Sequence, residues 1–174
     1  MYTFLRGTLL FVFVLTLAWT APSAAQVQDS VDVFTGDHYI HSDSLRRLSV
    51  ERFEGYDVGM EARYTKQVRA GTRWALSFYA YSARGTTLRD AREMYFVADG
   101  ERVRPYDTER DIYREEHGRY TMLVEKQTGL FKRSAYETLA SADSVRVKVG
   151  DAIFTVPKES RRDMELILSR VSPY

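Results

Sequence analysis

The stretch VGMEARYTKQVRAGTRWALSFYAYS, residues 58–82, decides the fold that the sequence predicts. Apolar and polar residues alternate over 58–65, and a second run over 74–82 has the same period, with apolar residues on both of its faces. A period of two is typical of β-strands, because successive side chains point to opposite faces. The polar segment between the runs favours a turn, so we expect the two strands to be neighbours.

Three further hairpins are predicted downstream of this pair of strands. Asp99-Gly100 lies between two short apolar runs, and both residue types suit the positive φ that a two-residue hairpin turn requires. His117-Gly118 and Gly150-Asp151 lie between alternating runs in the same way. The chain therefore predicts several strands joined by tight turns.

Two short helices are predicted among these strands. In residues 130–140 an apolar residue recurs every fourth position. Near the C-terminus, Ser160 is the expected N-cap, and Asp163 three residues later resembles a capping box. Apolar residues at 164, 167, 168 and 171 then form one helical stripe. We expect an α+β fold: a mainly antiparallel β-sheet or sandwich of about 6–8 strands with two short helices, one of them at the C-terminus.

The first 25 residues predict a cleaved signal peptide. Arg6 precedes an apolar run over residues 9–19, and the small residues of 21–25 follow it. The alternative is an uncleaved membrane anchor, but the apolar run is shorter than the roughly 20 residues that a transmembrane helix needs. We expect cleavage after Ala25 and a secreted or periplasmic protein.

The remainder of the chain predicts a poorly defined N-terminal lead-in, residues 26–55, followed by one β-rich α+β domain, residues 56–174. The lead-in has only short apolar islands separated by Gly, Asp and Ser. The sequence leaves open whether this segment folds or acts as a tether.

Composition excludes several classes of protein. The chain has 25 Lys and Arg against 24 Asp and Glu, and loss of Arg6 with the signal peptide makes it neutral, which argues against a nucleic-acid partner. The many charged residues argue against a membrane β-barrel, and we expect no stable membrane insertion after signal cleavage. The absence of cysteine excludes disulfides and thiolate metal sites.

The three histidines, His38, His41 and His117, are weak candidates for metal ligands. His38 and His41 would share a face on a helix, but the Gly, Ser and Asp residues around them favour a loop or a short strand, where residues three apart diverge. His117 lies beside a predicted turn. We therefore expect no metal site and no cofactor.

Motifs for catalysis are also missing. Glu115-Glu116 would face opposite sides of a strand, and the acidic series at 107, 109 and 111 is expected in a loop, neutralised by nearby arginines. The chain has no Gly-x-Ser-x-Gly elbow and no glycine-rich phosphate loop. We expect no catalytic residue.

The tyrosines are the most distinctive feature. Tyr79 and Tyr81 share one face of the 74–82 strand, and with Arg84, Arg102 or Arg104 at its edge they could bind a partner; the alternative is that they form the rim of the core. We expect an exported, non-catalytic domain that binds another macromolecule, an unidentified protein or glycan. The alternatives are an envelope hydrolase or metal-dependent enzyme that uses the three histidines, and a structural accessory subunit.

Overall fold

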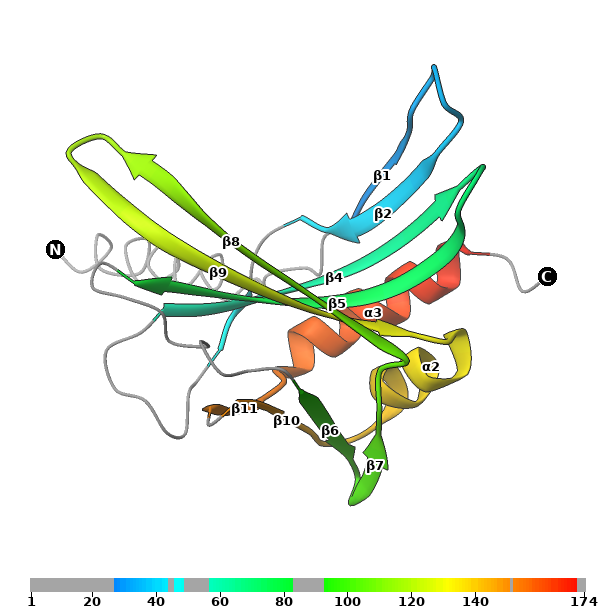
Figure 1. Ribbon diagram of the computed structural model, residues 1–174. Helices are drawn as coiled ribbons and strands as arrows, with labels where there is room; N and C mark the ends of the chain where they lie inside the picture. Colours follow the sequence, from blue (N-terminus) through cyan, green and yellow to red (C-terminus); the bar gives the residue numbers. More distant parts are fainter. Residues whose placement is uncertain (1–26, 44–45, 49–56, 83–92, 151, 172–174) are drawn as a thin grey trace, which may run out of the picture.

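The computed structural model describes residues 27–43, 46–48, 57–82, 93–150 and 152–171. The predicted signal peptide and Arg84 lie outside these ranges. Within them the chain forms two antiparallel sheets and two helices, which confirms the expected α+β, sheet-rich class (Figure 1). No helix of the described residues has the length and apolar character needed to cross a membrane.

The larger sheet has seven strands: β1 (Val27–Val31), β2 (His38–Ser42), β3 (Arg46–Arg47), β4 (Asp57–Gln67), β5 (Gly71–Ser82), β8 (Asp107–His117) and β9 (Tyr120–Phe131). Their order is β1-β2-β4-β5-β9-β8, and β3 pairs with β4 outside this path. The strands β1, β2 and β3 come from the segment that the sequence left undefined. They account for the strands beyond the expected 6–8.

The hairpin of β4 and β5 has the register that the alternating pattern requires. Val58 lies opposite Ala80, and Tyr64 lies opposite Trp74. These four side chains are all buried, as the period of two predicts. Gly71, just after the turn, has a φ of 82°, a conformation that glycine adopts without strain.

The smaller sheet has four strands: β6 (Met94–Ala98), β7 (Glu101–Val103), β10 (Val145–Val149) and β11 (Ala152–Thr155), in the order β11-β10-β6-β7. The predicted turn between β6 and β7 is confirmed, because Asp99 and Gly100 have φ values of 48° and 90°. The carboxylate of Asp99 accepts hydrogen bonds from the backbone N–H groups of Asp143, at 3.0 Å, and Ser144, at 2.8 Å. This turn therefore also fixes the start of β10.

Both helices are present, but their starting points differ from those predicted. Helix α2 (Arg133–Ser141) begins at Arg133 instead of residue 130, because β9 continues to Phe131. Helix α3 (Lys158–Arg170) has Pro157 at its N-cap, so the prediction of Ser160 as the cap is wrong. Proline has a fixed φ and no N–H to satisfy, which suits a helix start.

The helices and the smaller sheet cover one face of the larger sheet (Figure 1). The core between them is aromatic: the ring centre of Phe78 lies 6.0 Å from that of Phe96 and 6.1 Å from that of Phe154. Trp74 packs on Tyr136 of α2, with ring centres 5.1 Å apart. No element of the described ranges packs on the opposite face of the larger sheet (Figure 1).

Candidate functional site

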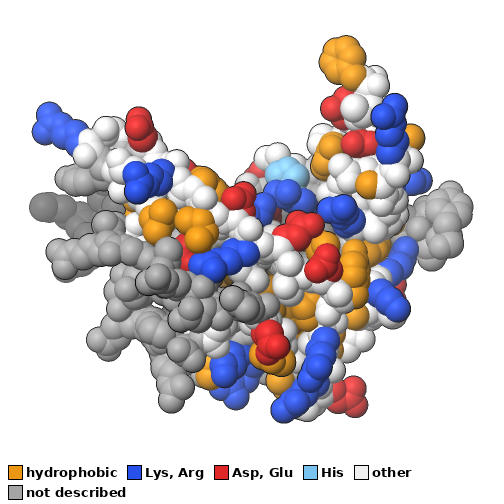
Figure 2. All heavy atoms as spheres, viewed as in Figure 1, with side chains coloured by type: hydrophobic (Ala, Val, Ile, Leu, Met, Phe, Trp, Pro, Cys, Tyr) orange, Lys and Arg blue, Asp and Glu red, His pale blue; other side chains and the backbone are white. Residues whose placement is uncertain are grey.

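The uncovered face of the larger sheet carries both tyrosines that the sequence singled out. It lies between the β1–β2 and β8–β9 hairpins, whose tips rise on either side (Figure 1). The space-filling view shows a hollow between them, lined by acidic and basic side chains and a histidine (Figure 2). We call this surface the open face and define it by Tyr39, His41, Glu61, Arg63, Arg73, Ser77, Tyr79, Tyr81, Glu109, Lys126 and Thr128.

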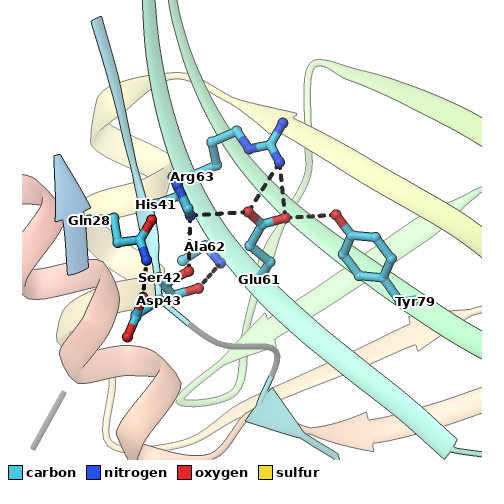
Figure 3. Close-up of polar contacts among 8 residues, drawn as sticks. All are labelled: Gln28, His41, Ser42, Asp43, Glu61, Ala62, Arg63 and Tyr79. Carbon is cyan, nitrogen blue, oxygen red and sulfur yellow. Dashed lines mark hydrogen bonds and ion pairs between the residues drawn. The ribbon is translucent and has the colours of Figure 1, made fainter. Parts of the chain in front are cut away.

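Glu61 of β4 is the centre of a polar network on this face (Figure 3). The hydroxyl of Tyr79 donates to Oε2 of Glu61 at 2.7 Å, and Nη2 of Arg63 lies 3.1 Å from both carboxylate oxygens. Nδ1 of His41 lies 3.6 Å from Oε1. Glu61 is only 9% exposed, and a buried carboxylate is stable only when its oxygens have partners. Its neighbours therefore fix its position.

His41 also connects this network to the adjacent strand. Its Nδ1 lies 3.1 Å from the backbone oxygen of Ser42, which can only accept, so the proton is on Nδ1. The hydroxyl of Ser42 in turn accepts a hydrogen bond from the N–H of Ala62 at 3.2 Å (Figure 3). The polar network thus spans β2, β4 and β5.

Tyr79 is held at both its hydroxyl and its ring. Burial raises the pKa of Tyr79 well above its usual value, and the hydrogen bond to the Glu61 carboxylate raises this pKa further. The phenol therefore keeps its proton at neutral pH and acts as a donor. Nζ of Lys126, directly across on β9, lies 5.5 Å from the ring centre, in cation–π range. Tyr79 is an ordered part of the open face.

Two further tyrosines extend the open face toward the β8–β9 hairpin. Tyr81 of β5 and Tyr113 of β8 both lie opposite Val124 of β9, one on each side. Burial raises the pKa of both phenols, and the charge of Glu115 contributes next. The sequence had indicated Tyr81 for this face but not Tyr113, because the register of β8 on β9 is not visible in the sequence.

A shallow cavity of about 190 Å³ lies on the open face, with Arg63, Arg73 and Lys126 among its lining. Two polar pairs cross it: the hydroxyls of Ser77 and Thr128, 2.9 Å apart, and Nη1 of Arg73 with Oε1 of Glu109, 3.2 Å apart. Pockets for small molecules typically measure about 300–1,000 Å³. This hollow suits a partner that lies across the sheet rather than a small molecule enclosed by it.

The structure does not bring the predicted arginines to these tyrosines. Arg102 and Arg104 lie beside Tyr95 on the outer face of the smaller sheet, and the guanidinium of Arg104 is 5.9 Å from the centre of that ring. Arg84 lies outside the described residues. The cations of the open face are Arg63, Arg73 and Lys126. The sequence carried a signal for Arg63, which alternates with buried residues in 58–65, but none for the position of Lys126 beside Tyr79.

The histidines do not come together in the part of the chain that the structure describes. His38 and His41 are three residues apart on β2 and point to opposite faces, and Nε2 of His38 lies 2.6 Å from Oδ1 of Asp29. His117 ends β8, and its side chain is outside the description. Among the described residues, no three His, Asp or Glu side chains form a group that could hold a metal ion.

The acidic series is placed on a strand and not in the expected loop. Asp107, Glu109 and Asp111 belong to β8, because β8 starts at Asp107 and pairs with β9 over its whole length. Glu109 forms its ion pair with Arg73 of β5. The sequence did not predict a strand here, because most side chains of this segment are charged and few are apolar.

Comparison of the chain with protein-family models, with curated proteins and with solved structures gives no match.

Proposed function

We propose that the chain is an exported, non-catalytic domain that binds another macromolecule, a protein or a glycan, on the open face of its larger sheet. One observation carries this proposal: a sheet face that no described element covers presents ordered aromatic and charged groups in a hollow between two hairpins. Tyrosine and arginine are the residue types enriched at binding interfaces, since each offers both contact area and hydrogen bonds.

The charges of the open face support a polar partner. Its arginine and lysine side chains lie beside acids or over a ring, as in the pairs Arg63–Glu61, Arg73–Glu109 and Lys126–Tyr79. Such preorganised groups lose little conformational entropy when a partner binds. Tyr79 is only 8% exposed, so it shapes the surface, whereas Arg73 and Lys126 can make direct contacts.

Partner capture tests this proposal. The full chain is immobilised and exposed to an envelope extract and to a glycan array, together with the double variant Arg73→Gln/Lys126→Gln. A matched control, Arg102→Gln/Lys148→Gln, makes the same charge change on the smaller sheet. We expect the wild type to capture a partner. The affinity for this partner should fall at least tenfold in the open-face variant and stay unchanged in the control, and the circular dichroism of both variants should match that of the wild type. Equal binding by the two variants, or no partner in either assay, would overturn the proposal.

Export is tested separately by the mass of the product. When the chain is expressed in a bacterium with its own N-terminus, we expect the mature protein to begin at Gln26. A product that retains Arg6 would contradict cleavage after Ala25.

A further inference from the structure

A second cavity lies on the other side of the larger sheet. It has a volume of about 700 Å³, within the range of small-molecule pockets. It is bordered by the end of the β4–β5 hairpin, the start of α2 and the end of α3, which lie together on one side of the molecule (Figure 1). The open face plays no part in it.

Aromatic rings form one part of its wall. Tyr64, Trp74 and Phe131 are almost completely buried and belong to the core, and the ring centres of Tyr64 and Trp74 are 4.7 Å apart. Tyr106, by contrast, is 54% exposed. The core therefore continues into the cavity as an apolar wall that already has its final shape, and a flat or apolar group could pack against it.

Cations form the other part. Lys66, Lys132, Arg133 and Arg170 all line the cavity, and no Asp or Glu is among the described residues of its lining. Arg133 forms an ion pair with Glu137 at 2.7 Å and lies over Trp74, 5.5 Å from the ring centre.

Among the described residues, the other cations of the lining have no acidic partner. Arg170 donates to the backbone oxygen of Val27 at 3.0 Å, a neutral acceptor. Within the described part of the chain, no ion pair is recorded for Lys66 or Lys132. The ring of His38, which also borders the cavity, already contacts Asp29. Like charges around a concave site repel one another, and an anion bound there relieves that repulsion.

We propose that this cavity binds a small organic anion, a carboxylate carried on an aromatic or other apolar ring. The ring would pack against the wall of Tyr64, Trp74 and Tyr106, and the carboxylate would accept hydrogen bonds from Lys66, Lys132 and Arg170. The inference is independent of the proposed function, because the cavity lies on the face of the sheet opposite to the open face.

Tryptophan fluorescence provides a direct test. The chain has two tryptophans, Trp19 and Trp74, so the full chain with Trp19→Phe has its only tryptophan in the cavity wall. The probe is 4-iodobenzoate, whose heavy atom quenches a nearby indole, and 4-iodobenzyl alcohol is the neutral control. The charge-removing variant is Lys66→Gln/Lys132→Gln, and its matched control is Lys148→Gln/Lys158→Gln, outside the cavity.

We expect saturable quenching by the carboxylate, linear and unsaturable quenching by the alcohol, and a Kd for the carboxylate at least tenfold higher in the Lys66→Gln/Lys132→Gln variant than in its control. Inorganic phosphate should displace the probe only at a far higher concentration, because it has no ring. Equal saturation by the alcohol, an unchanged Kd in the charge-removing variant, or displacement by phosphate at the concentration of the probe would each overturn the proposal. Both exposed lysines can also be replaced singly if the double variant does not fold.

Discussion

The phenolic oxygen of Tyr79 lies 2.7 Å from Oε2 of Glu61, two buried side chains on neighbouring strands of a sheet face that no described element covers. Arg63 donates to the carboxylate of Glu61, and the ammonium group of Lys126 lies over the ring of Tyr79. The open face therefore has its own small polar core, and its shape depends on hydrogen bonds more than on apolar packing.

Tyr79→Phe should lower the free energy of unfolding by about 2 kcal/mol, because it removes a hydrogen bond to a charged group and leaves a buried carboxylate oxygen with one partner fewer. Urea denaturation at pH 7 measures this loss. The control is Tyr81→Phe, on the same strand and face, for which no hydrogen bond of the hydroxyl is recorded among the described residues; we expect a change within about 0.5 kcal/mol. Equal losses in the two variants would show that the Glu61 contact is not the cause.

Alkaline pH should remove the advantage of Tyr79 over phenylalanine. The pKa of Tyr79 is raised in the folded protein, so its stabilising effect is complete below the pKa of an unfolded tyrosine, about 10, and is lost as the pH rises above it. The stability difference between the wild type and Tyr79→Phe should therefore shrink by up to about 1.4 kcal/mol per pH unit above pH 10. Unfolding of both proteins between pH 8 and 11 checks this. A difference that stays constant would contradict a raised pKa.

The sequence predicted those parts of the fold in which local pattern and burial agree. The 58–82 hairpin and the Asp99-Gly100 turn both have a local signal that does not depend on the rest of the chain. The sequence predicted a loop for the first part of β8, because Glu109 and Asp111 are charged and the pairing of this segment with β9 cannot be seen in the sequence. Strands β1 to β3 have too few apolar residues to show a period of two.

The candidate site was less predictable than the fold for a related reason. Tyr79 and Tyr81 share a face through local alternation alone, so the sequence could place them together. Their neighbour Lys126 comes from β9, and its position depends on a register set by long-range pairing. The predicted neighbours Arg102 and Arg104 lie on β7 of the smaller sheet and just after it, since β6 of the β6–β7 hairpin pairs with β10 and not with β5.

Asp99→Ala should destabilise the smaller sheet by about 2 kcal/mol. The change removes the acceptor for the N–H groups of Asp143 and Ser144 and puts alanine at a positive φ, where aspartate is better tolerated. Asp143→Ala, an exposed acid in the connection to β10, is the control and should have little effect. Thermal unfolding of both variants measures the difference. Similar unfolding temperatures would mean that the turn does not anchor β10.

Arg46→Met should be the most destabilising of these substitutions, by about 3–5 kcal/mol, because it leaves the carboxylate of Asp163 buried without its ion-pair partner. Asp163 of α3 is fully buried, and Nε and Nη2 of Arg46 lie 3.1 and 3.4 Å from its two oxygens. The control Arg162→Met changes an exposed arginine of α3, the helix that carries Asp163, and should leave the free energy of unfolding nearly unchanged. The double variant Arg46→Met/Asp163→Leu replaces the pair by apolar side chains, so it should be clearly more stable than the sum of the two single losses predicts. Strictly additive losses in urea unfolding would show that the two residues do not act as a pair, and that another contact holds α3 against β3.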